Sequence, residues 1–280
     1  MRGSDYRYED LGRRYFAELC GADILSCEQS PLHDEHQSSP MMARWCVTWR
    51  GNRGRHAGSF VAKKLLSGHE REIPIYRWLQ DNTTVNMPTL IDFRYDPENA
   101  NCWMLTESCY NYKDVEYYYL NRLFFSSPAW PPATEPTDPP GAFLRPLADL
   151  HGKTLGINWD RVQDCPIPFY EPPSPAAVPS WVRAMRAVIH GSMNFQEVGF
   201  RKLPAFPPMW CLFDWESAHV GPICFDLAQV HYGMSRPISD EALSWYVQEV
   251  HRMSGTCLGL SEIREGIEIS RVVLGLSDPG

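Results

Sequence analysis

The side chains best placed for chemistry are two carboxylates in the segment Cys211–Val230. An apolar run that predicts a strand ends at Asp214, and Asp226 follows twelve residues later, where a second apolar run predicts a helix. A carboxylate at a strand end can face a cleft and bind Mg²⁺, which takes one or two carboxylates and leaves its other positions to phosphates and water. We expect Asp226 in the first turn or at the N-cap of its helix, where exposed N–H groups stabilise a negative charge. For these two residues alone, a strand end and a helix cap without a catalytic role are the simpler explanation.

The residues around both carboxylates add a pattern that two isolated aspartates lack. Asp214 is followed at fixed spacing by Trp215, Glu216, Ala218, Gly221, Pro222, Asp226, Leu227 and Ala228. This string resembles the D-W-E-x-A-x-x-G-P-x-x-x-D-L-A signature of the aminoglycoside phosphotransferase/choline kinase-like family. Upstream, Leu147–His151 (LADLH) resembles the L-A-x-L-H helix of the same family. The resemblance covers roughly residues 20–250.

This resemblance implies an α+β, two-lobed protein-kinase-like fold. The N-terminal lobe would hold a small antiparallel β-sheet, and the larger C-terminal lobe would be mainly helical. ATP and Mg²⁺ would be the cofactors, with Asp214 as the metal-binding aspartate. In the family, an H-G-D-x-x-x-x-N loop precedes the strand of the metal aspartate. The Asp of that loop accepts the proton of the substrate hydroxyl, and its Asn holds the second metal ion.

The matching loop of this chain departs from the family at both of those positions. His190 and Gly191 are kept, but Ser192 stands at the Asp position and Glu197 at the Asn position. A serine hydroxyl is neutral near pH 7 and cannot act as a base without a partner. Loss of a positioned base costs about 10²–10⁴-fold in rate. Glu197 could still bind a metal, because a carboxylate is a harder donor than an amide, and Asn194 is an alternative metal ligand.

The placement of these residues depends on whether the loop forms. We expect Asp214 and Glu197 to lie close together at the cleft between the lobes, with Asp226 behind them bracing the loop. A single helix over Ser180–Val198 would instead make the match accidental, although Gly191 is unfavourable inside a helix. Under either alignment the base is missing.

A lysine and a glutamate in the first third of the chain are expected to contact the nucleotide. Val61–Lys64 (VAKK) and Glu72 resemble the lysine strand and the glutamate helix of the family, whose two charged side chains pair. Strand alternation places Lys64 on one face and Lys63 on the other, and the V-A-x-K spacing of kinase strands favours Lys64. We therefore expect Lys64 to point into the cleft and approach Glu72. Two solvent-exposed lysines are the alternative.

Two other parts of a nucleotide site follow from the resemblance. Trp103–Glu107 would be the hinge that hydrogen-bonds the adenine, which adds Glu107 to the nucleotide-contacting residues. No glycine-rich phosphate loop precedes Met42, because the glycines Gly51, Gly54 and Gly58 lie in the next hairpin. The sequence therefore gives no support for phosphate binding by backbone N–H groups there.

The elements that must hold these residues divide the chain near Glu107. Residues 1–107 alternate short apolar runs with turn-rich segments, which predicts a β-rich nucleotide lobe. The expected strands are Ile24–Cys27, Met42–Trp49, Ser59–Leu66, Thr89–Tyr95 and Cys102–Thr106, and the expected helices are Tyr6–Cys20 and His69–Gln80. Pro74 is compatible with the second helix only in its first turn.

Residues 108–280 are expected to form the helical lobe, which carries the loop at His190 and the strand before Asp214. The expected helices are Tyr112–Phe125, Phe143–Thr154, Trp181–Ile189, Ser239–Ser254 and Ser261–Leu276, and the expected strand is Trp210–Phe213. Pro128–Pro140 and Pro166–Pro179 are proline-rich and predict loops, because proline interrupts helices and central strands.

Composition and charge exclude several classes of function. The chain has 280 residues, with 26 Lys+Arg against 34 Asp+Glu and a net charge of −8, and no basic stripe. A nucleic-acid or anionic-membrane partner is therefore not expected, and no apolar run approaches the roughly 18–20 residues of a membrane span. The nine cysteines form no CxxC pair, which favours reduced thiols in a cytoplasmic protein. No GxSxG or HExxH motif supports a lipase-like hydrolase or a zinc protease.

Three functions remain open at this point. The chain could be an active ATP-dependent small-molecule O-kinase, a pseudokinase-type protein that binds a small molecule, or an enzyme whose cleft catalyses a repurposed reaction in a small-molecule pathway. Ser192 and Glu197 oppose the first function and do not separate the other two. The sequence therefore predicts a phosphotransferase-like protein that has lost phosphoryl transfer and binds a small-molecule ligand or substrate, with an active kinase as the alternative. With the base missing, the resemblance supports the fold more strongly than it supports ATP and Mg²⁺.

Overall fold

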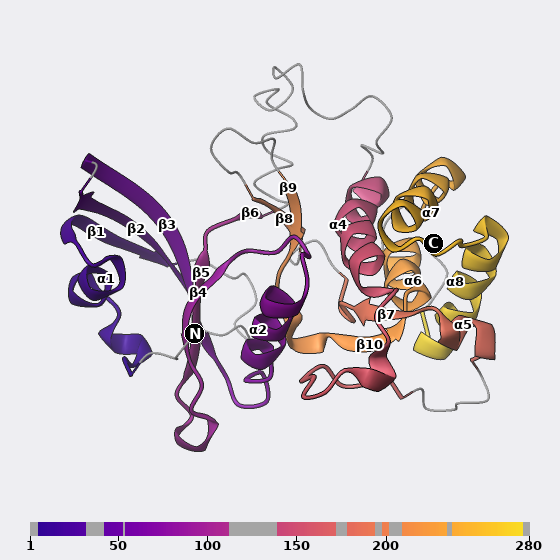
Figure 1. Ribbon diagram of the computed structural model, residues 1–280, viewed down its shortest axis with the longest axis horizontal. Helices are drawn as coiled ribbons and strands as arrows, with labels where there is room; N and C mark the ends of the chain where they lie inside the picture. Colours follow the sequence, from indigo (N-terminus) through magenta and orange to yellow (C-terminus); the bar gives the residue numbers. More distant parts are fainter. Residues whose placement is uncertain are drawn as a thin grey trace, which may run out of the picture. The chain divides into compact units, whose positions relative to one another are not determined.

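The computed structural model describes residues 5–31, 42–52, 54–111, 139–171, 178–193, 198–201, 209–233 and 237–276. Two compact units make up the chain (Figure 1). The first comprises Met1–Gln80 with Pro88–Cys109, and the second comprises Asp81–Met87 with Tyr110–Gly280. The expected helix Tyr112–Phe125, most of the expected loop Pro128–Pro140, and the candidate metal ligands Asn194 and Glu197 lie outside the described residues.

The first unit is built on a five-stranded antiparallel sheet with the strand order β1-β2-β3-β5-β4. The strands are β1 (Asp23–Pro31), β2 (Met42–Gly51), β3 (Gly54–Leu65), β4 (Leu90–Arg94) and β5 (Cys102–Glu107). The helical elements are the 3₁₀ turns η1 (Tyr8–Asp10) and η2 (Pro97–Asn99) and the helices α1 (Arg13–Cys20) and α2 (Glu72–Asn82). All five expected strands are confirmed, and Pro74 lies in the first turn of α2 as expected.

The two faces of this sheet are covered by different helices. On one face α1 packs Tyr15 and Phe16 into the core, where the rings of Phe16 and Phe60 stack 5.5 Å apart. Ala62 follows Phe60 on the same face of β3 and is fully buried in that core. The other face of β3 turns to α2, whose Glu72 pairs with Lys63. Because successive side chains of β3 point to opposite faces of the sheet, each one contacts either the α1 side or the α2 side.

The second unit combines helices with two small sheets. The helices are α4 (Pro139–Thr154), α5 (Ser180–Ala184), α6 (Cys224–Gly233), α7 (Asp240–Ser254) and α8 (Leu260–Leu274), with the 3₁₀ turns η3 (Trp159–Arg161) and η5 (Trp215–Ser217). One sheet pairs β7 (Arg186–Ile189) with β10 (His219–Pro222), and the other orders β6 (Tyr110–Asn111), β8 (Val198–Arg201) and β9 (Met209–Leu212) as β6-β8-β9. Helix α4 packs on α7, and α6 packs on α8. The expected α+β organisation is confirmed, with a sheet in the first unit and mainly helices in the second.

One expected helix, Trp181–Ile189, is wrong in its second half. The helix α5 ends at Ala184, and Arg186–Ile189 forms β7, which pairs antiparallel with β10. The β-branched residues Val188 and Ile189 are buried in this pairing, so tertiary contacts override the local helical pattern. The alternative of one helix over Ser180–Val198 is excluded by the same strand.

Helix α7 begins directly after a residue that caps it. Ser239 is the N-cap of α7, and its side chain accepts a hydrogen bond of 3.2 Å from the backbone N–H of Ala242. Such a cap satisfies one of the N–H groups that the first turn leaves without a helical partner. Within the described ranges, no helix is both long and apolar enough to cross a membrane.

Candidate functional site

The loop after β7 holds the residues that the sequence identified as catalytic-loop-like. β7 ends at Ile189, and the chain then turns through His190, Gly191 and Ser192. Gly191 has φ +82°, a left-handed conformation that glycine adopts without strain. A Cβ at this position would overlap the carbonyl oxygen of Ser217, so the close approach of the backbone also requires glycine.

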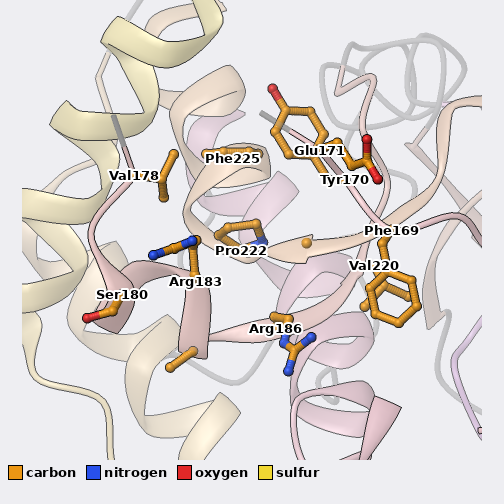
Figure 2. A pocket seen from close by; sticks show the side chains of 12 residues that line it. Phe169, Tyr170, Glu171, Val178, Ser180, Arg183, Arg186, Val220, Pro222 and Phe225 are labelled. Carbon is orange, nitrogen blue, oxygen red and sulfur yellow. The ribbon is translucent and has the colours of Figure 1, made fainter. Parts of the chain in front are cut away.

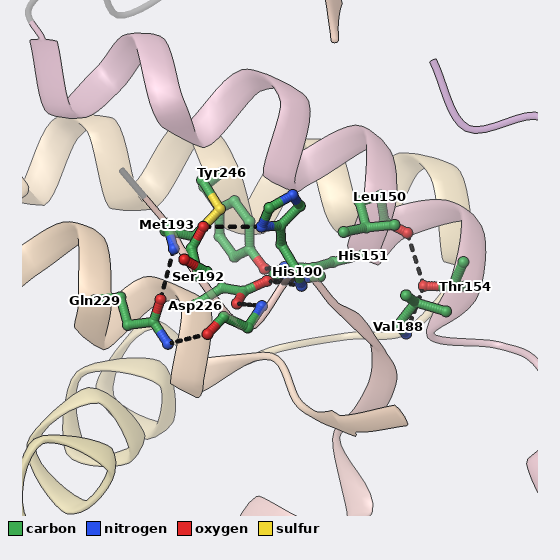
Figure 3. A network of polar contacts seen from close by, with 11 residues as sticks. Leu150, His151, Thr154, Val188, His190, Ser192, Met193, Asp226, Gln229 and Tyr246 are labelled. Carbon is green, nitrogen blue, oxygen red and sulfur yellow. Dashed lines mark hydrogen bonds and ion pairs between the residues drawn. The ribbon is translucent and has the colours of Figure 1, made fainter. Parts of the chain in front are cut away.

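The carboxylate of Asp226 accepts hydrogen bonds from the backbone of this loop (Figure 3). Asp226 is fully buried in the first turn of α6, as the sequence predicts. Its Oδ2 accepts from the backbone N–H of His190 at 2.7 Å, and its Oδ1 accepts from that of Gly191 at 2.9 Å. Hydrogen bonds to an ionised acceptor are about twice as strong as neutral ones. The expected bracing of the loop by Asp226 is confirmed.

Two further buried side chains extend this network. His151 Nε2 lies 3.2 Å from Asp226 Oδ2, and His151 Nδ1 lies 2.7 Å from the hydroxyl of Tyr246. Because a carboxylate only accepts, Nε2–H donates to Asp226 and Nδ1 accepts from Tyr246. Burial raises the pKa of Tyr246 well above its ordinary value, so its hydroxyl keeps the proton that it donates. His151 is thus a hydrogen-bonded core histidine.

Gln229 also holds the loop through two hydrogen bonds, and this role was not predicted from the sequence. Its Oε1 accepts from the backbone N–H of Met193 at 2.7 Å, and its Nε2 donates to the carbonyl oxygen of Gly191 at 3.0 Å. Gln229 lies three residues after Asp226 in α6, so both side chains leave the same face of the helix. That spacing is the signal that could have identified it.

His190 connects the loop to the backbone before Asp214. Its ring is buried, with Nδ1 2.9 Å from the carbonyl oxygen of Ser192 and Nε2 2.9 Å from that of Phe213. The ring also lies 5.0 Å from that of Trp215. His190 therefore orients backbone and is not itself exposed to a substrate.

Asp214 follows β9 in a conformation that is unusual for its residue type. It has φ +72° and is the N-cap residue of the 3₁₀ turn η5, and its side chain is half-buried. Aspartate is among the few residues that visit this region, and such backbone strain persists where the surroundings hold it. The ring of His190 contacts the carbonyl oxygens of Ser192 and of Phe213, the residue before Asp214. It therefore connects the backbone at Ser192 with the backbone at Asp214. Ser192, which the sequence resemblance aligns with the catalytic Asp of the family, follows Gly191 in this loop.

The expected pairing of Lys64 with Glu72 is wrong. Lys63 Nζ lies 2.7 Å from Glu72 Oε2, and the two side chains are only 11% and 2% exposed. Lys64 instead pairs with Glu9 of η1, on the face of β3 that α1 covers. The alternation of the two lysines was assigned correctly, but the face that meets α2 was not. The turn η1, which contains Glu9, covers the face of β3 on which Lys64 lies. The V-A-x-K spacing does not indicate this contact.

The hinge prediction rests on the end of β5. Glu107 Oε2 accepts from the hydroxyl of Thr89 at 2.6 Å, and the backbone N–H of Glu107 donates to the carbonyl oxygen of Thr89 at 3.0 Å. These bonds tie the end of β5 to the residue before β4. Contact of Glu107 with a nucleotide stays a prediction.

Comparison with known proteins places this geometry beside one group of enzymes. No protein-family profile matches the chain, and no curated protein matches it. Among solved structures, the GDP complex of a mutant aminoglycoside 2'-phosphotransferase-IIIa is 10% identical with a TM-score of 0.49, over 93% of this chain and 87% of that one. The GDP and kanamycin complex of APH(2")-IIIa is 10% identical with a TM-score of 0.46, over 93% and 88%. A mutant APH(4)-Ia with ADP and hygromycin B is 11% identical with a TM-score of 0.43, over 94% and 90%.

In fold, the chain resembles aminoglycoside phosphotransferases. The likeness is one of fold, and it says nothing of what this chain binds or catalyses.

Proposed function

We propose that this protein binds a Mg²⁺–nucleotide at a kinase-like site and does not transfer its phosphoryl group. The observation that carries the proposal is the loop at Ser192. Four hydrogen bonds fix that loop: two of its backbone N–H groups donate to the carboxylate of Asp226, and two of its backbone groups bond to the side chain of Gln229. The residue it presents has a hydroxyl in place of the carboxylate that deprotonates the acceptor.

The chemistry of Ser192 opposes catalysis, and the scaffold around it supports binding. A serine hydroxyl can donate a hydrogen bond to a phosphate or a substrate, but at neutral pH it cannot take up a proton. The left-handed Asp214 and the buried carboxylate of Asp226 are costly features for a fold to keep. Their presence favours a site that still positions a ligand.

The donors of the chain fit a Mg²⁺–nucleotide. Asp214 offers the hard carboxylate oxygen that Mg²⁺ takes, and the ion would neutralise charge on the phosphates. Lys63, held by Glu72 at 2.7 Å, offers an ammonium group for phosphate oxygens. Glu107 would lie at the hinge. Glu197 would complete the metal ligands.

Calorimetric titration of ATP and ADP, each with and without Mg²⁺, tests the binding. We expect wild-type protein to bind both nucleotides in the presence of Mg²⁺. Asp214→Asn removes a charged ligand and should weaken binding by about tenfold or more, as the loss of one charge-assisted interaction predicts. Asp160→Asn, on an exposed turn of the same unit, is the control and should leave binding unchanged. No heat of binding for either nucleotide would contradict the proposal and favour a repurposed reaction.

An active ATP-dependent small-molecule O-kinase is the second candidate. Asp214 and the buried pair of Lys63 and Glu72 favour it, because they are the groups that would hold the metal and the phosphates. The similar solved structures contain kanamycin or hygromycin B, which makes aminoglycosides the first acceptors to assay. Phosphoryl transfer to such an acceptor separates the two candidates.

A further inference from the structure

The second unit contains a cavity of about 680 Å³. Its apolar part is lined by Phe169, Tyr170, Val178, Ala184, Val220, Gly221, Pro222 and Phe225, and its polar part by Glu171, Ser180, Arg183 and Arg186. Figure 2 shows Tyr170 and Phe225 on one side and Arg183 and Arg186 rising from the α5–β7 segment on the other. This volume and the mixture of an apolar wall with a few polar groups are typical of a small-molecule site.

The cavity lies away from the loop at Ser192. In the antiparallel pair of β7 and β10, Ile189 faces His219 at the end that leads into the loop, and Arg186 faces Pro222 at the other end. Arg186 and Pro222 line the cavity. In α6, Phe225 lines the cavity while its neighbour Asp226 holds the loop. From this small sheet the cavity uses Arg186, Val220, Gly221 and Pro222, whereas the loop continues from Ile189.

The aromatic wall is fixed before any ligand binds. The rings of Tyr170 and Phe225 meet edge to face at 4.6 Å, and Tyr170 meets the ring of His219 at 6.1 Å. The backbone N–H of Tyr170 donates to the carbonyl oxygen of Val220 at 2.9 Å, and that of Val220 donates to Pro168 at 2.8 Å. A wall held in this way loses little conformational entropy on binding.

The charges at the cavity favour an anion. Arg183 is exposed at the rim and forms no ion pair with any residue that the structure describes. Arg186 lies 3.5 Å from Asp160, but that carboxylate is 74% exposed and leaves the guanidinium only partly compensated. The two arginines outnumber the single lining carboxylate, Glu171, in a chain whose net charge is −8. A guanidinium group matches a carboxylate with two parallel N–H donors.

We propose that this cavity is a second binding site, which takes a small aromatic carboxylate. The ring packs against Tyr170 and Phe225, and the carboxylate pairs with Arg183. Neither Asp214 nor Ser192 contributes to this site. The proposal is therefore independent of whether the protein binds a nucleotide.

Fluorescence titration of the full chain with 2-naphthoate and with its neutral analogue 2-naphthamide tests this site. We expect the carboxylate to bind about tenfold more tightly than the amide, as one charge-assisted hydrogen bond predicts. Arg183→Met should remove that difference and leave the affinity for 2-naphthamide unchanged. Ala184→Trp places a large side chain at an exposed lining position and should weaken both probes by about tenfold or more, because it fills the volume that they share.

Two control variants make the outcome decisive. Arg161→Met removes an exposed arginine of the same unit that does not line the cavity, and Asp214→Ala removes the metal aspartate. Both should bind 2-naphthoate as the wild type does. Equal binding of the two probes by the wild type would overturn the proposal. So would an unchanged affinity in Ala184→Trp, or the same loss in Arg161→Met as in Arg183→Met.

Discussion

At the scale of single residues, Gly191 and Asp226 decide the conformation of the loop that carries Ser192. Gly191 supplies the left-handed turn with φ +82°, and Asp226 accepts the backbone N–H groups of His190 and Gly191. A backbone that must turn this sharply beside another chain segment has only one residue type available to it. The two residues therefore act together, and replacing either one should lower the free energy of unfolding.

We predict that Gly191→Ala lowers the free energy of unfolding by about 3 kcal/mol, from the left-handed strain and the overlap of a new Cβ with Ser217. Gly255→Ala is a matched control, since Gly255 has φ +71° but a Cβ added there would meet no atom within 4 Å. It should cost only about 1 kcal/mol, the strain alone. Urea unfolding followed by circular dichroism measures both. Equal losses would show that the close approach to Ser217 does not constrain the loop.

The sequence could predict most of this residue-scale arrangement. The place of Asp226 in a first helical turn follows from residue type and spacing, and its bracing of the loop was expected from the family resemblance. Gln229 shares the face of α6 with Asp226, and that spacing could have identified it, but its partners, the backbone groups of Gly191 and Met193, lie far away in the sequence. Local sequence patterns predict which helix or strand holds a side chain. Its partners depend on contacts with residues far away in the sequence.

At the scale of elements, strand β3 shows how a correct pattern can lead to a wrong pairing. Alternation separates Lys63 from Lys64, but the face that meets α2 depends on where α1 and η1 pack. The segment α5–β7 shows the same limit, because the buried pairing with β10 converts a helical pattern at Val188 and Ile189 into a strand. In both cases tertiary packing supplies information that neither spacing nor propensity contains.

We predict that Lys63→Met destabilises the protein by about 3–5 kcal/mol, because it removes the cation beside the buried carboxylate of Glu72. Lys64→Met should cost less than about 1 kcal/mol, as is typical of pairs that reach solvent; Glu9 is 55% exposed. The midpoint of urea unfolding measures both effects. A larger loss for Lys64→Met than for Lys63→Met would mean that the face of β3 has been assigned wrongly.

At the scale of the whole molecule, the thiols report on how the described core excludes solvent. Cys102, Cys211 and Cys224 are buried, whereas Cys46 and Cys257 are exposed, and none of the nine cysteines is in a disulfide. Burial raises the pKa of Cys224 to about 12. Since the thiolate is the reactive form, both access and protonation protect this residue.

We predict that iodoacetamide at pH 8 labels Cys46 and Cys257 first and leaves Cys224 unlabelled until the protein unfolds. A thiol with a pKa of about 12 has only roughly one part in ten thousand as thiolate at pH 8. Peptide mass spectrometry after timed quenching measures the labelling of each cysteine, and labelling in urea is the positive control. Modification of Cys224 as fast as that of Cys46 would show that α6 does not bury it.

The proposed loss of phosphoryl transfer is tested most directly by following the γ-phosphate of labelled ATP in the presence of kanamycin, hygromycin B and simple amino alcohols. The wild type should transfer no more phosphate than Asp214→Ala does, because Ser192 cannot take the proton of an acceptor hydroxyl. A double substitution of Ser192→Asp and Glu197→Asn, which restores both residues of the loop, should raise the rate above that background. Transfer by the wild type that Asp214→Ala abolishes would contradict the proposal and show an active kinase.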